Sequence, residues 1–499
     1  MFSAVLFFLV FLAVALLGRR HARLLRGKAY GDMPGPWALP LIGNLSHMFH
    51  PDLPVHFLKL TELYGPIYHL RFGNKDVVVL NSSDLIREAL TRKWTDFAGR
   101  PYSFVANLIS LGGRDLSLGD YTPAWRLQRK LTHMAFQRCL RGDMEQIVRN
   151  QAQRLCQVFR GYRGEPVDVA RDFSLHACQV ISAMMFGPLD SSAIKEIHDC
   201  TIELVERWSA VSVQVLDFLP ILRVFPNAAL RKLLSCVAKR DAFVQDMMKK
   251  HEESRHPTEM RYMVDHMLQI LQEHVADKRR DLGLSPEHIH MAIVDLFIGG
   301  TETTAALLTW TVAFLLHRSE IQDRIHHEIM TVIGFDRDPT YSDREHLPYL
   351  SATITESLRL RPSAPLALPH VATRDTSLSG FPIPKGTTII PNLYGAHHDG
   401  SKWDCPLEFR PERFLESDDS SSYEAQRNLV PFSCGARGCL GEALARMESF
   451  LFLAHILRDF RILPPLSGSL PDLRGQFGTV VHCKPFTVRL LPRGADSAA

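Results

Sequence analysis

The sequence predicts a mainly α-helical protein with small β-sheets, folded as one large domain behind an N-terminal membrane anchor. From about residue 90 to residue 360 the apolar residues recur mostly at helical spacing, with Pro and Gly breaks but no long linker or internal repeat. Shorter strand-like segments lie near residues 67–80 and 379–390 and close to the C-terminus. The chain opens with an apolar run followed by basic residues, which is typical of an anchor.

The predicted anchor covers residues 1–18. Residues 2–17 are apolar except for Ser3, and this run is slightly shorter than the ~20 residues of a spanning helix. The basic residues after it can snorkel and place the body in the cytoplasm, at the endoplasmic reticulum membrane. A signal peptide cleaved at residues 13–15 is the alternative, but no basic residue precedes the apolar run. Residues 19–50 then form a basic and proline-rich hinge, and residues 51–495 form one large globular domain.

Charge and cysteine content argue against a nucleic-acid-binding protein and against a protein built on a disulfide framework. A net charge of +3 gives no general basic excess of the kind that nucleic-acid-binding proteins show, so we expect no nucleic acid partner. The nine cysteines are an odd number with no C-x-x-C pair. They are typical of reduced thiols in a cytosol-facing protein.

Individual elements follow from periodicity and punctuation. Residues 67–72 and 76–80 are β-rich and joined across Gly73-Asn74, which predicts a hairpin. Strands are also expected over residues 387–390 and 486–491. A helix over residues 350–360 must end before Pro362. A very long buried helix over residues 286–318 begins with Ser285 as its N-cap and Pro286 at its first position.

Residues 432–441 (FSCGARGCLG) form a compact glycine-rich loop before a predicted helix over residues 442–457. Cys439 therefore lies near a helix N-terminus, where the dipole and free N–H groups stabilise a thiolate. Gly435 and Gly441 allow close approach of a flat ring, and Arg437 can pair with a carboxylate of the same cofactor. A zinc site would need two further ligands that this spacing does not offer. From these residues alone, a metal-ligating thiolate and an ordinary buried thiol both stay open.

The middle of the long helix departs from core composition. Residues 299–304 (GGTETT) place two glycines, an acid and three hydroxyls where packing favours Leu or Ala. Adjacent glycines weaken the helical hydrogen-bond ladder and open room for a small ligand or water. A kinked packing site is the alternative interpretation of the same residues.

The segment around Cys439 matches the pattern F-x-x-G-x-R-x-C-x-G and resembles the haem-binding signature of the cytochrome P450 superfamily. The resemblance implies a single large cytochrome P450 fold in which Cys439 is the axial thiolate of haem b and Phe432 and Arg437 contact the haem. It also implies that Glu302 and Thr303 are the acid–alcohol pair that relays protons during the activation of O2.

Further motifs of the superfamily are similar to segments of this chain. They imply that Glu356 and Arg359 bind Arg413 of the segment Pro411-Glu412-Arg413-Phe414 as a structural clamp. The resemblance also implies a set of haem-propionate contacts, namely Trp125, Arg129, Arg100, His370 and, as a weaker candidate, Arg374.

Electron supply is also implied by the resemblance. Arg126 and Lys130 form a second basic row on the helix of Trp125 and Arg129. In the family such a face meets an acidic electron donor, here NADPH-cytochrome P450 reductase, with NADPH as the source of electrons.

Several stretches over about residues 51–493 resemble the family of vertebrate steroid 21-hydroxylases, among them residues 115–121 and 365–370. That likeness implies hydroxylation of a 3-keto steroid (progesterone, 17-hydroxyprogesterone) at carbon 21, in corticosteroid biosynthesis. Arg240 would bind the 3-keto oxygen, and the other expected substrate contacts are Trp208, Asp295, Ala364 and Leu368. Another steroid or xenobiotic hydroxylase of the superfamily, or a non-catalytic haem- or steroid-binding protein, is the alternative.

Overall fold

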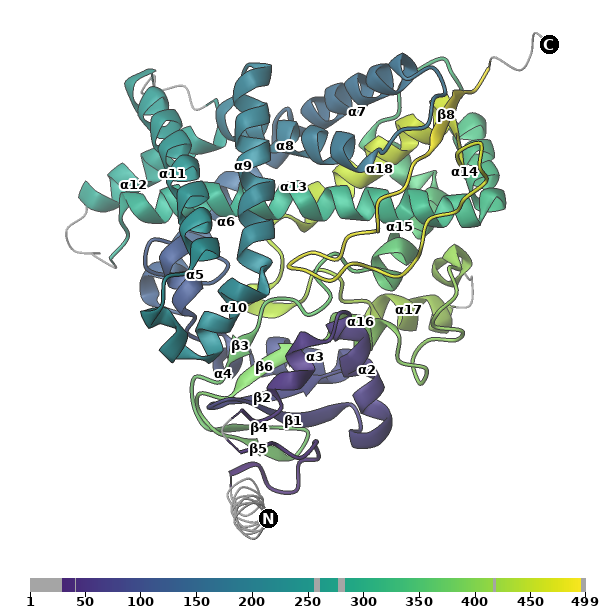
Figure 1. Cartoon of the computed structure of the whole chain (residues 1–499). Coiled ribbons are helices and arrows are strands. Elements are labelled where there is room, and N and C mark those ends of the chain that lie inside the picture. The colour runs from purple at the N-terminus through teal and green to yellow at the C-terminus, as the bar shows by residue number, and fades with distance from the viewer. Residues whose placement is uncertain (1–28, 41, 255–260, 277–282, 416–418, 495–499) are drawn as a thin grey trace, which may run out of the picture.

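The structure is a computed structural model that describes residues 29–40, 42–254, 261–276, 283–415 and 419–494. The predicted anchor and the first part of the predicted hinge lie outside these residues. Of the three small sheets in the described residues, two lie at one end of a large helical part, beside the first described residues, and the third, nearest the C-terminus, lies at the other end (Figure 1). The predicted fold class, mainly α with small β-sheets, is confirmed.

The largest sheet has four strands in the order β1-β2-β6-β3. β1 (Ile67–Phe72) and β2 (Lys75–Leu80) are the predicted hairpin, turning at Gly73 with φ +61°. β6 (Thr388–Pro391) runs parallel to β2, and β3 (His370–Val371) pairs with β6 in the antiparallel sense. The sheet thereby holds His370 next to residues 97–100, because Gly99 bridges Val371.

Two smaller two-stranded sheets complete the β-structure. They pair β4 (Thr376–Leu378) with β5 (Phe381–Ile383), and β7 (Phe460–Leu463) with β8 (Arg489–Pro492). Residues ahead of β1 pack against the first sheet, since Tyr30, Met33 and Leu45 are buried and Asn44 hydrogen-bonds β1. The described part of the predicted hinge thus lies on the body of the protein.

The helices make up the rest of the body. Those that matter for the site or its surroundings are α2 (Leu53–Tyr64), α5 (Phe104–Ile109), α6 (Pro123–Arg141), α7 (Met144–Gly161), α8 (Ala170–Phe186), α9 (Ser191–Ser209), α10 (Val211–Phe218), α11 (Ala228–Ser254), α12 (Met263–Ala276), α13 (Pro286–His317), α14 (Ser319–Val332), α15 (Pro348–Leu360), α16 (Leu393–His397), α17 (Asp419–Asn428) and α18 (Glu442–Asp459).

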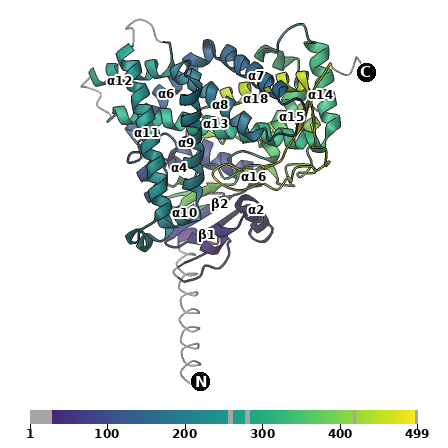
Figure 2. The ribbon, with the colours of Figure 1, turned by 45° about the horizontal axis from the view of Figure 1, so that its top comes forward.

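Helix α13 runs through the middle of the helical part and packs along α8 (Figures 1 and 2). It begins as predicted, with Ser285 as N-cap and Pro286 in the first turn. Among the described helices it alone is long and apolar enough to span a bilayer, but most of that stretch is buried, so it is a core helix. The helix is unbroken through Gly299 and Gly300, and the predicted weakening of its hydrogen-bond ladder is not observed.

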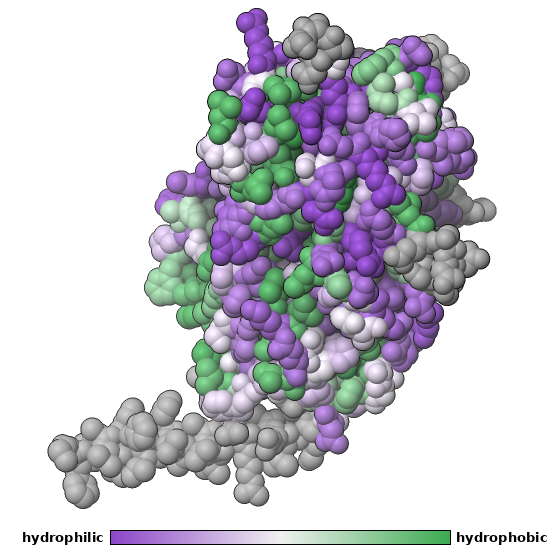
Figure 3. Space-filling model, turned by 90° about the vertical axis from the view of Figure 1, so that its right-hand side faces the viewer, coloured by the Kyte–Doolittle hydropathy of each residue, from purple (hydrophilic) through white to green (hydrophobic). Residues whose placement is uncertain are grey.

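The molecular surface is mixed rather than uniformly polar. Figure 3 shows one face on which small hydrophobic groups alternate with hydrophilic ones. Exposed large apolar side chains also occur at the end of the molecule formed by β1, α2 and α10 (Figure 2): Trp37, Leu39, Ile42, Phe49, Leu63, Val211, Ile221, Val224 and Phe225. This end therefore offers apolar side chains to solvent or to another phase.

Candidate active site

A cavity of about 300 Å³ lies between α13 and the loop before α18. It brings together residues that are far apart in the sequence. Of the predicted site residues, those that line it are Arg100, Arg129, Asp295, Thr303, Ala364, Leu368, His370, Phe432, Arg437 and Cys439.

The loop that presents Cys439 is fixed by its own backbone. The Cys439 N–H donates to the carbonyl of Phe432 at 2.9 Å, and that of Gly438 donates to Gly435 at 3.0 Å. Gly435 has φ +73°, and a Cβ there would lie 1.6 Å from the carbonyl oxygen of Leu90. Only glycine fits this approach, so the loop can take this form with few other sequences.

Cys439 lines the cavity and is exposed to it. Burial raises the pKa of this thiol, and the backbone N–H groups of Gly441 and Glu442 and the charge of Arg129 act in the opposite direction. These donors at the start of α18 are the ones that would stabilise a thiolate bound to a cation. Cys434, in contrast, does not line the cavity and packs against apolar residues.

Three arginines converge at one edge of the cavity. Arg437 lies 3.6 Å above the ring of Trp125 and donates to the carbonyls of Ala98 and Gly119, both at 2.9 Å. Arg100 donates to Ser117 and Leu368, and Arg129 donates to Gly438. Burial, together with the charges of neighbouring guanidinium groups, lowers the pKa of Arg437 to about 9 and that of Arg100 to about 10.

These residues fit haem b. The three arginines repel one another and are held mainly by neutral carbonyls, so they are suited to bind the two propionate carboxylates of haem b. The Cys439 thiol lies in the same cavity and can bind the iron. His370 donates from Nδ1 to the carbonyl of Phe97 at 2.7 Å. Burial and then Arg100 hold the pKa of His370 well below its usual value, so its other nitrogen accepts rather than donates. Arg100, Arg129 and Arg437 therefore offer the charged donors for propionates, and His370 lies in the same cavity with its second nitrogen free of the Phe97 contact.

Two predicted haem contacts do not line the cavity. Trp125 lies behind Arg129 and Arg437, and its indole N–H donates to the carbonyl of Leu116 at 3.0 Å. Arg374 is exposed and pairs with Asp96, with Nε 2.7 Å from a carboxylate oxygen. The structure thus gives Trp125 a supporting place and leaves Arg374 at the surface.

The far wall of the cavity is the middle of α13. Gly299 lines the cavity, and a Cβ there would meet nothing within 4 Å, whereas Gly300 packs closely against Ile181. The Thr303 hydroxyl faces the cavity and donates to the Gly299 carbonyl at 2.5 Å. Glu302 does not line the cavity: its carboxylate accepts from the Ser174 hydroxyl of α8 at 2.6 Å. The structure therefore separates the two members of the predicted acid–alcohol pair.

Only some of the predicted substrate contacts line the cavity. Ala364, Leu368 and Asp295 line the cavity, and Asp295 accepts from the Leu116 N–H at 2.5 Å and from the Ser117 hydroxyl at 2.8 Å. Burial, and secondly Asp115, raise the pKa of Asp295 to about 8.

Arg240 and Trp208 do not line the cavity. Arg240 is buried, donates to the Ile109 carbonyl at 2.9 Å and pairs with Asp241 at 2.7 Å. Trp208 packs on apolar residues of α5, α9, α10 and α11. Both side chains thus lie in helices, α9 and α11, that pack against α13.

The predicted clamp residues meet in the core. Arg359 makes two hydrogen bonds to the Glu356 carboxylate, at 2.7 and 2.8 Å, and Arg413 donates to the same carboxylate at 3.0 Å. All three side chains are buried. Arg359 also donates to the carbonyls of His397, Pro406 and Glu408, which ties α15 to the segment after α16.

Some notable residues were missed in the sequence. Glu448 of α18 lines the cavity, and burial raises the pKa of its carboxyl to about 8. The signal available in the sequence was the position of Glu448, an acidic residue at the start of a long apolar run. Ser174 and His482 also contact Glu302, but they lie far away in sequence and carry no motif.

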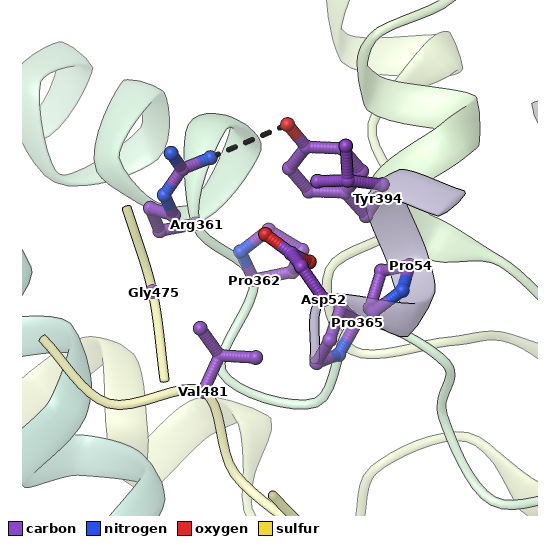
Figure 4. A pocket seen from close by; sticks show the side chains of 9 residues that line it. Asp52, Pro54, Arg361, Pro362, Pro365, Tyr394, Gly475 and Val481 are labelled. Atoms are coloured by element: carbon purple, nitrogen blue, oxygen red, sulfur yellow. Dashed lines mark hydrogen bonds between the residues drawn. The ribbon is translucent and has the colours of Figure 1, made fainter. Parts of the chain in front are cut away.

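A second, small pocket of about 20 Å³ lies beside the end of α15 (Figure 4). Arg361 and Tyr394 face each other there, 3.5 Å apart, and Asp52 approaches from the start of α2. The pocket has room for about one water molecule. It is too small to be a substrate site.

Residues 33–490 match the family model described as Cytochrome P450. The chain is 45% identical to steroid 21-hydroxylase of Canis lupus over 483 residues, 95% of each protein. It is 45% identical to the Homo sapiens steroid 21-hydroxylase, covering 91% of this chain and 92% of the relative.

A solved structure of a zebra fish cytochrome P450 with progesterone is also similar, with a TM-score of 0.80 and 33% identity over 89% of this chain and all of that one. The match of the whole body of the chain, together with a cavity that fits haem b above a cysteine thiol, leads to one assignment: the chain belongs to the cytochrome P450 family.

Proposed function

We propose that this cytochrome P450 monooxygenase hydroxylates a 3-keto steroid, progesterone or 17-hydroxyprogesterone, at carbon 21. The observation that carries the proposal is the identity of 43–45%, over more than nine tenths of the chain, with relatives named steroid 21-hydroxylase. The similar zebra fish structure was solved with progesterone, which supports a steroid substrate as well.

Haem b, bound through Cys439, would supply the chemistry that activates O2 and attacks the steroid. The chain holds it in place: Arg100, Arg129 and Arg437 would bind the propionates, and the Cys439 loop fixes the ligand. Thr303 presents its hydroxyl to the cavity and would hold a proton or a water close to the reacting atoms. Glu302 would supply that proton from behind Thr303.

The cavity suits a rigid apolar ligand with few polar groups. Apolar residues such as Ile181, Leu296 and Leu368 form much of the wall. Arg240 would bind the 3-keto oxygen at the far end, where its charge already acts on Asp295 of the cavity wall. For this it would exchange its hydrogen bond to the Ile109 carbonyl for one to the steroid.

The electrons would come from NADPH through NADPH-cytochrome P450 reductase. Arg126 and Lys130 are exposed on α6. Arg129 of the same helix donates to the carbonyl of Gly438, the residue before Cys439. A basic face thus lies close to the thiol, which favours docking of an acidic donor there.

Attachment to the endoplasmic reticulum membrane, with the catalytic domain in the cytoplasm, completes the proposal. Residues 1–18 would be the anchor and residues 51–495 the catalytic domain. The exposed apolar side chains at the β1 and α10 end are suited to contact lipid beside such an anchor.

Product analysis tests the proposal. The full chain with reductase, NADPH and O2 should convert progesterone and 17-hydroxyprogesterone to 21-hydroxylated products. Hydroxylation elsewhere on the steroid, or of unrelated compounds only, would indicate another hydroxylase of the family. NADPH consumption that does not rise when steroid is added would instead indicate a protein that binds haem or steroid without turnover.

A further inference from the structure

We propose that Asp199, His198 and Ser174 form a proton relay that reloads Glu302 from solvent on the α9 side of the molecule. The inference rests on the proposed monooxygenase function, which consumes protons at the cavity. It assigns a task to three residues outside the cavity, and it explains why Glu302 faces α8.

The contacts form an unbroken chain. The Ser174 hydroxyl of α8 donates to Glu302 at 2.6 Å and lies 2.9 Å from Nε2 of His198. The other ring nitrogen of His198 lies 3.1 Å from a carboxylate oxygen of Asp199. Every link is within hydrogen-bonding distance. The helices that carry them, α8, α9 and α13, pack together (Figure 1).

Burial along the chain falls toward the surface in the order a relay requires. The side chain of His198 is 4% exposed and that of Asp199 is 48% exposed. Ser174 is buried between His198 and Glu302. Solvent therefore reaches one end of the chain, while the other end lies in the core beside the cavity wall.

The directions of the hydrogen bonds define what His198 carries. Because Ser174 gives its only proton to Glu302, Nε2 of His198 must donate to Ser174. Nδ1 faces the Asp199 carboxylate, so it donates as well. In the loaded state of the proposed relay, the ring thus carries a proton on both nitrogens beside the Asp199 carboxylate.

One proton moves in each transfer. His198 gives its Nε2 proton to the Ser174 oxygen, and Ser174 gives its hydroxyl proton to Glu302. Neutral His198 keeps the proton that faces Asp199. The bare Nε2 then takes up the next proton from bulk water, which enters beside the exposed Asp199.

The last part of the path runs over Gly299. Glu302 lies three residues after Gly299, so both lie on one side of α13. The missing side chain of Gly299 leaves open space that belongs to the cavity. The Glu302 carboxyl can turn into this space and bring its proton to the side of Thr303.

Among the groups around the relay, His482 is the one other candidate in the described residues for passing a proton to Glu302. His482 lies on the opposite side of Glu302, but its Nε2 is 3.7 Å from the carboxylate, longer than a hydrogen bond. Cys178 also faces Glu302, and burial raises the pKa of its thiol to about 12, so it holds its proton. Arg171, 3.5 Å from Asp199, adds positive charge at the solvent end.

Ser174→Ala and His198→Phe break the relay at different links. With reductase and steroid, each should lower product formed per NADPH by about tenfold or more, raise peroxide release and increase the solvent deuterium isotope effect. Ser174→Thr keeps the hydroxyl and should restore all three values. His482→Gln is the matched control on the other side of Glu302. The relay is excluded if His482→Gln causes these changes and Ser174→Ala does not.

A second measurement is independent of turnover. In full-length protein labelled with 15N-histidine, the His198 signals, identified by their loss in His198→Phe, should show a ring protonated on both nitrogens. Glu302→Gln and Ser174→Ala should remove the second proton. A singly protonated ring that is unchanged in both variants would overturn the relay. Because this readout needs no product, it separates failure of the relay from failure of the proposed reaction.

Discussion

The two walls of the cavity are built in different ways. On the cysteine side, a loop of ten residues and the start of α18 hold Cys439, Phe432 and Arg437 through backbone hydrogen bonds. On the far side, the wall is formed by helices from separate parts of the chain, and Arg240 and Trp208 lie in the layer behind it. The proposed iron ligand is therefore held by a short contiguous motif, whereas the far side of the cavity depends on how distant helices pack.

The largest effect is expected at the centre of the cysteine side. Cys439→Ala should abolish the red-shifted absorption band of the reduced protein with carbon monoxide, because the thiolate ligand is lost. Cys434→Ala is the matched control, since this thiol does not line the cavity. The assignment of the two cysteines would be reversed if Cys434→Ala alone removed the band.

The clamp should carry the next largest effect. Glu356→Gln removes a carboxylate that accepts from two buried arginines, which leaves their charges unbalanced. We expect a loss of about 3–5 kcal/mol in the free energy of unfolding, measured with denaturant.

Arg374→Ala provides the comparison for the clamp, because it breaks an exposed ion pair and should cost less than about 1 kcal/mol. Equal losses in the two variants would show that the buried clamp adds no more stability than a surface pair.

A smaller effect, on steroid binding, is expected for Arg240 in the helices behind the far wall. Arg240→Lys keeps the charge but loses the planar donor pair, so binding of a 3-keto steroid should weaken by about tenfold, roughly 1.4 kcal/mol. The measurement is a steroid titration followed by the haem absorption spectrum. The exposed neighbour Lys239 gives the control Lys239→Gln.

A steroid with a hydroxyl in place of the 3-keto group sharpens this test. Its binding should respond less to Arg240→Lys, because the hydroxyl can also donate to other acceptors. If both steroids lose affinity equally, Arg240 shapes the helical layer and does not contact the 3-keto oxygen.

The same contrast explains what the sequence could predict. The hairpin at Gly73, the start of α13 at Ser285 and the Glu356–Arg359 pair depend on residues a few positions apart, where turn geometry and helical spacing suffice. The direction of Glu302 depends on Ser174, 128 positions away, and no local pattern encodes that contact. The unbroken helix through Gly299 and Gly300 likewise depends on distant residues, because Gly300 packs against Ile181 of α8, and this packing offsets the weak helix propensity of glycine.

The effect of Glu448 on stability is expected to be small at pH 5 and to grow as pH rises. Burial holds its pKa at about 8 in the folded protein, above the ordinary value of a glutamate. Between those two values the folded state binds one proton more than the unfolded state, so this group lowers stability as pH rises. Near neutral pH the wild type should lose about 1.4 kcal/mol per pH unit relative to Glu448→Gln, which cannot ionise.

Thermal unfolding of both proteins from pH 5 to 8 measures this difference. The curves should diverge as pH rises, with the variant becoming the more stable of the two. Parallel curves would mean that Glu448 is ionised in the fold and that a cation or water in the cavity stabilises its charge. In that case the cysteine side would depend on a charged side chain of α18 as well as on the backbone hydrogen bonds of its short motif.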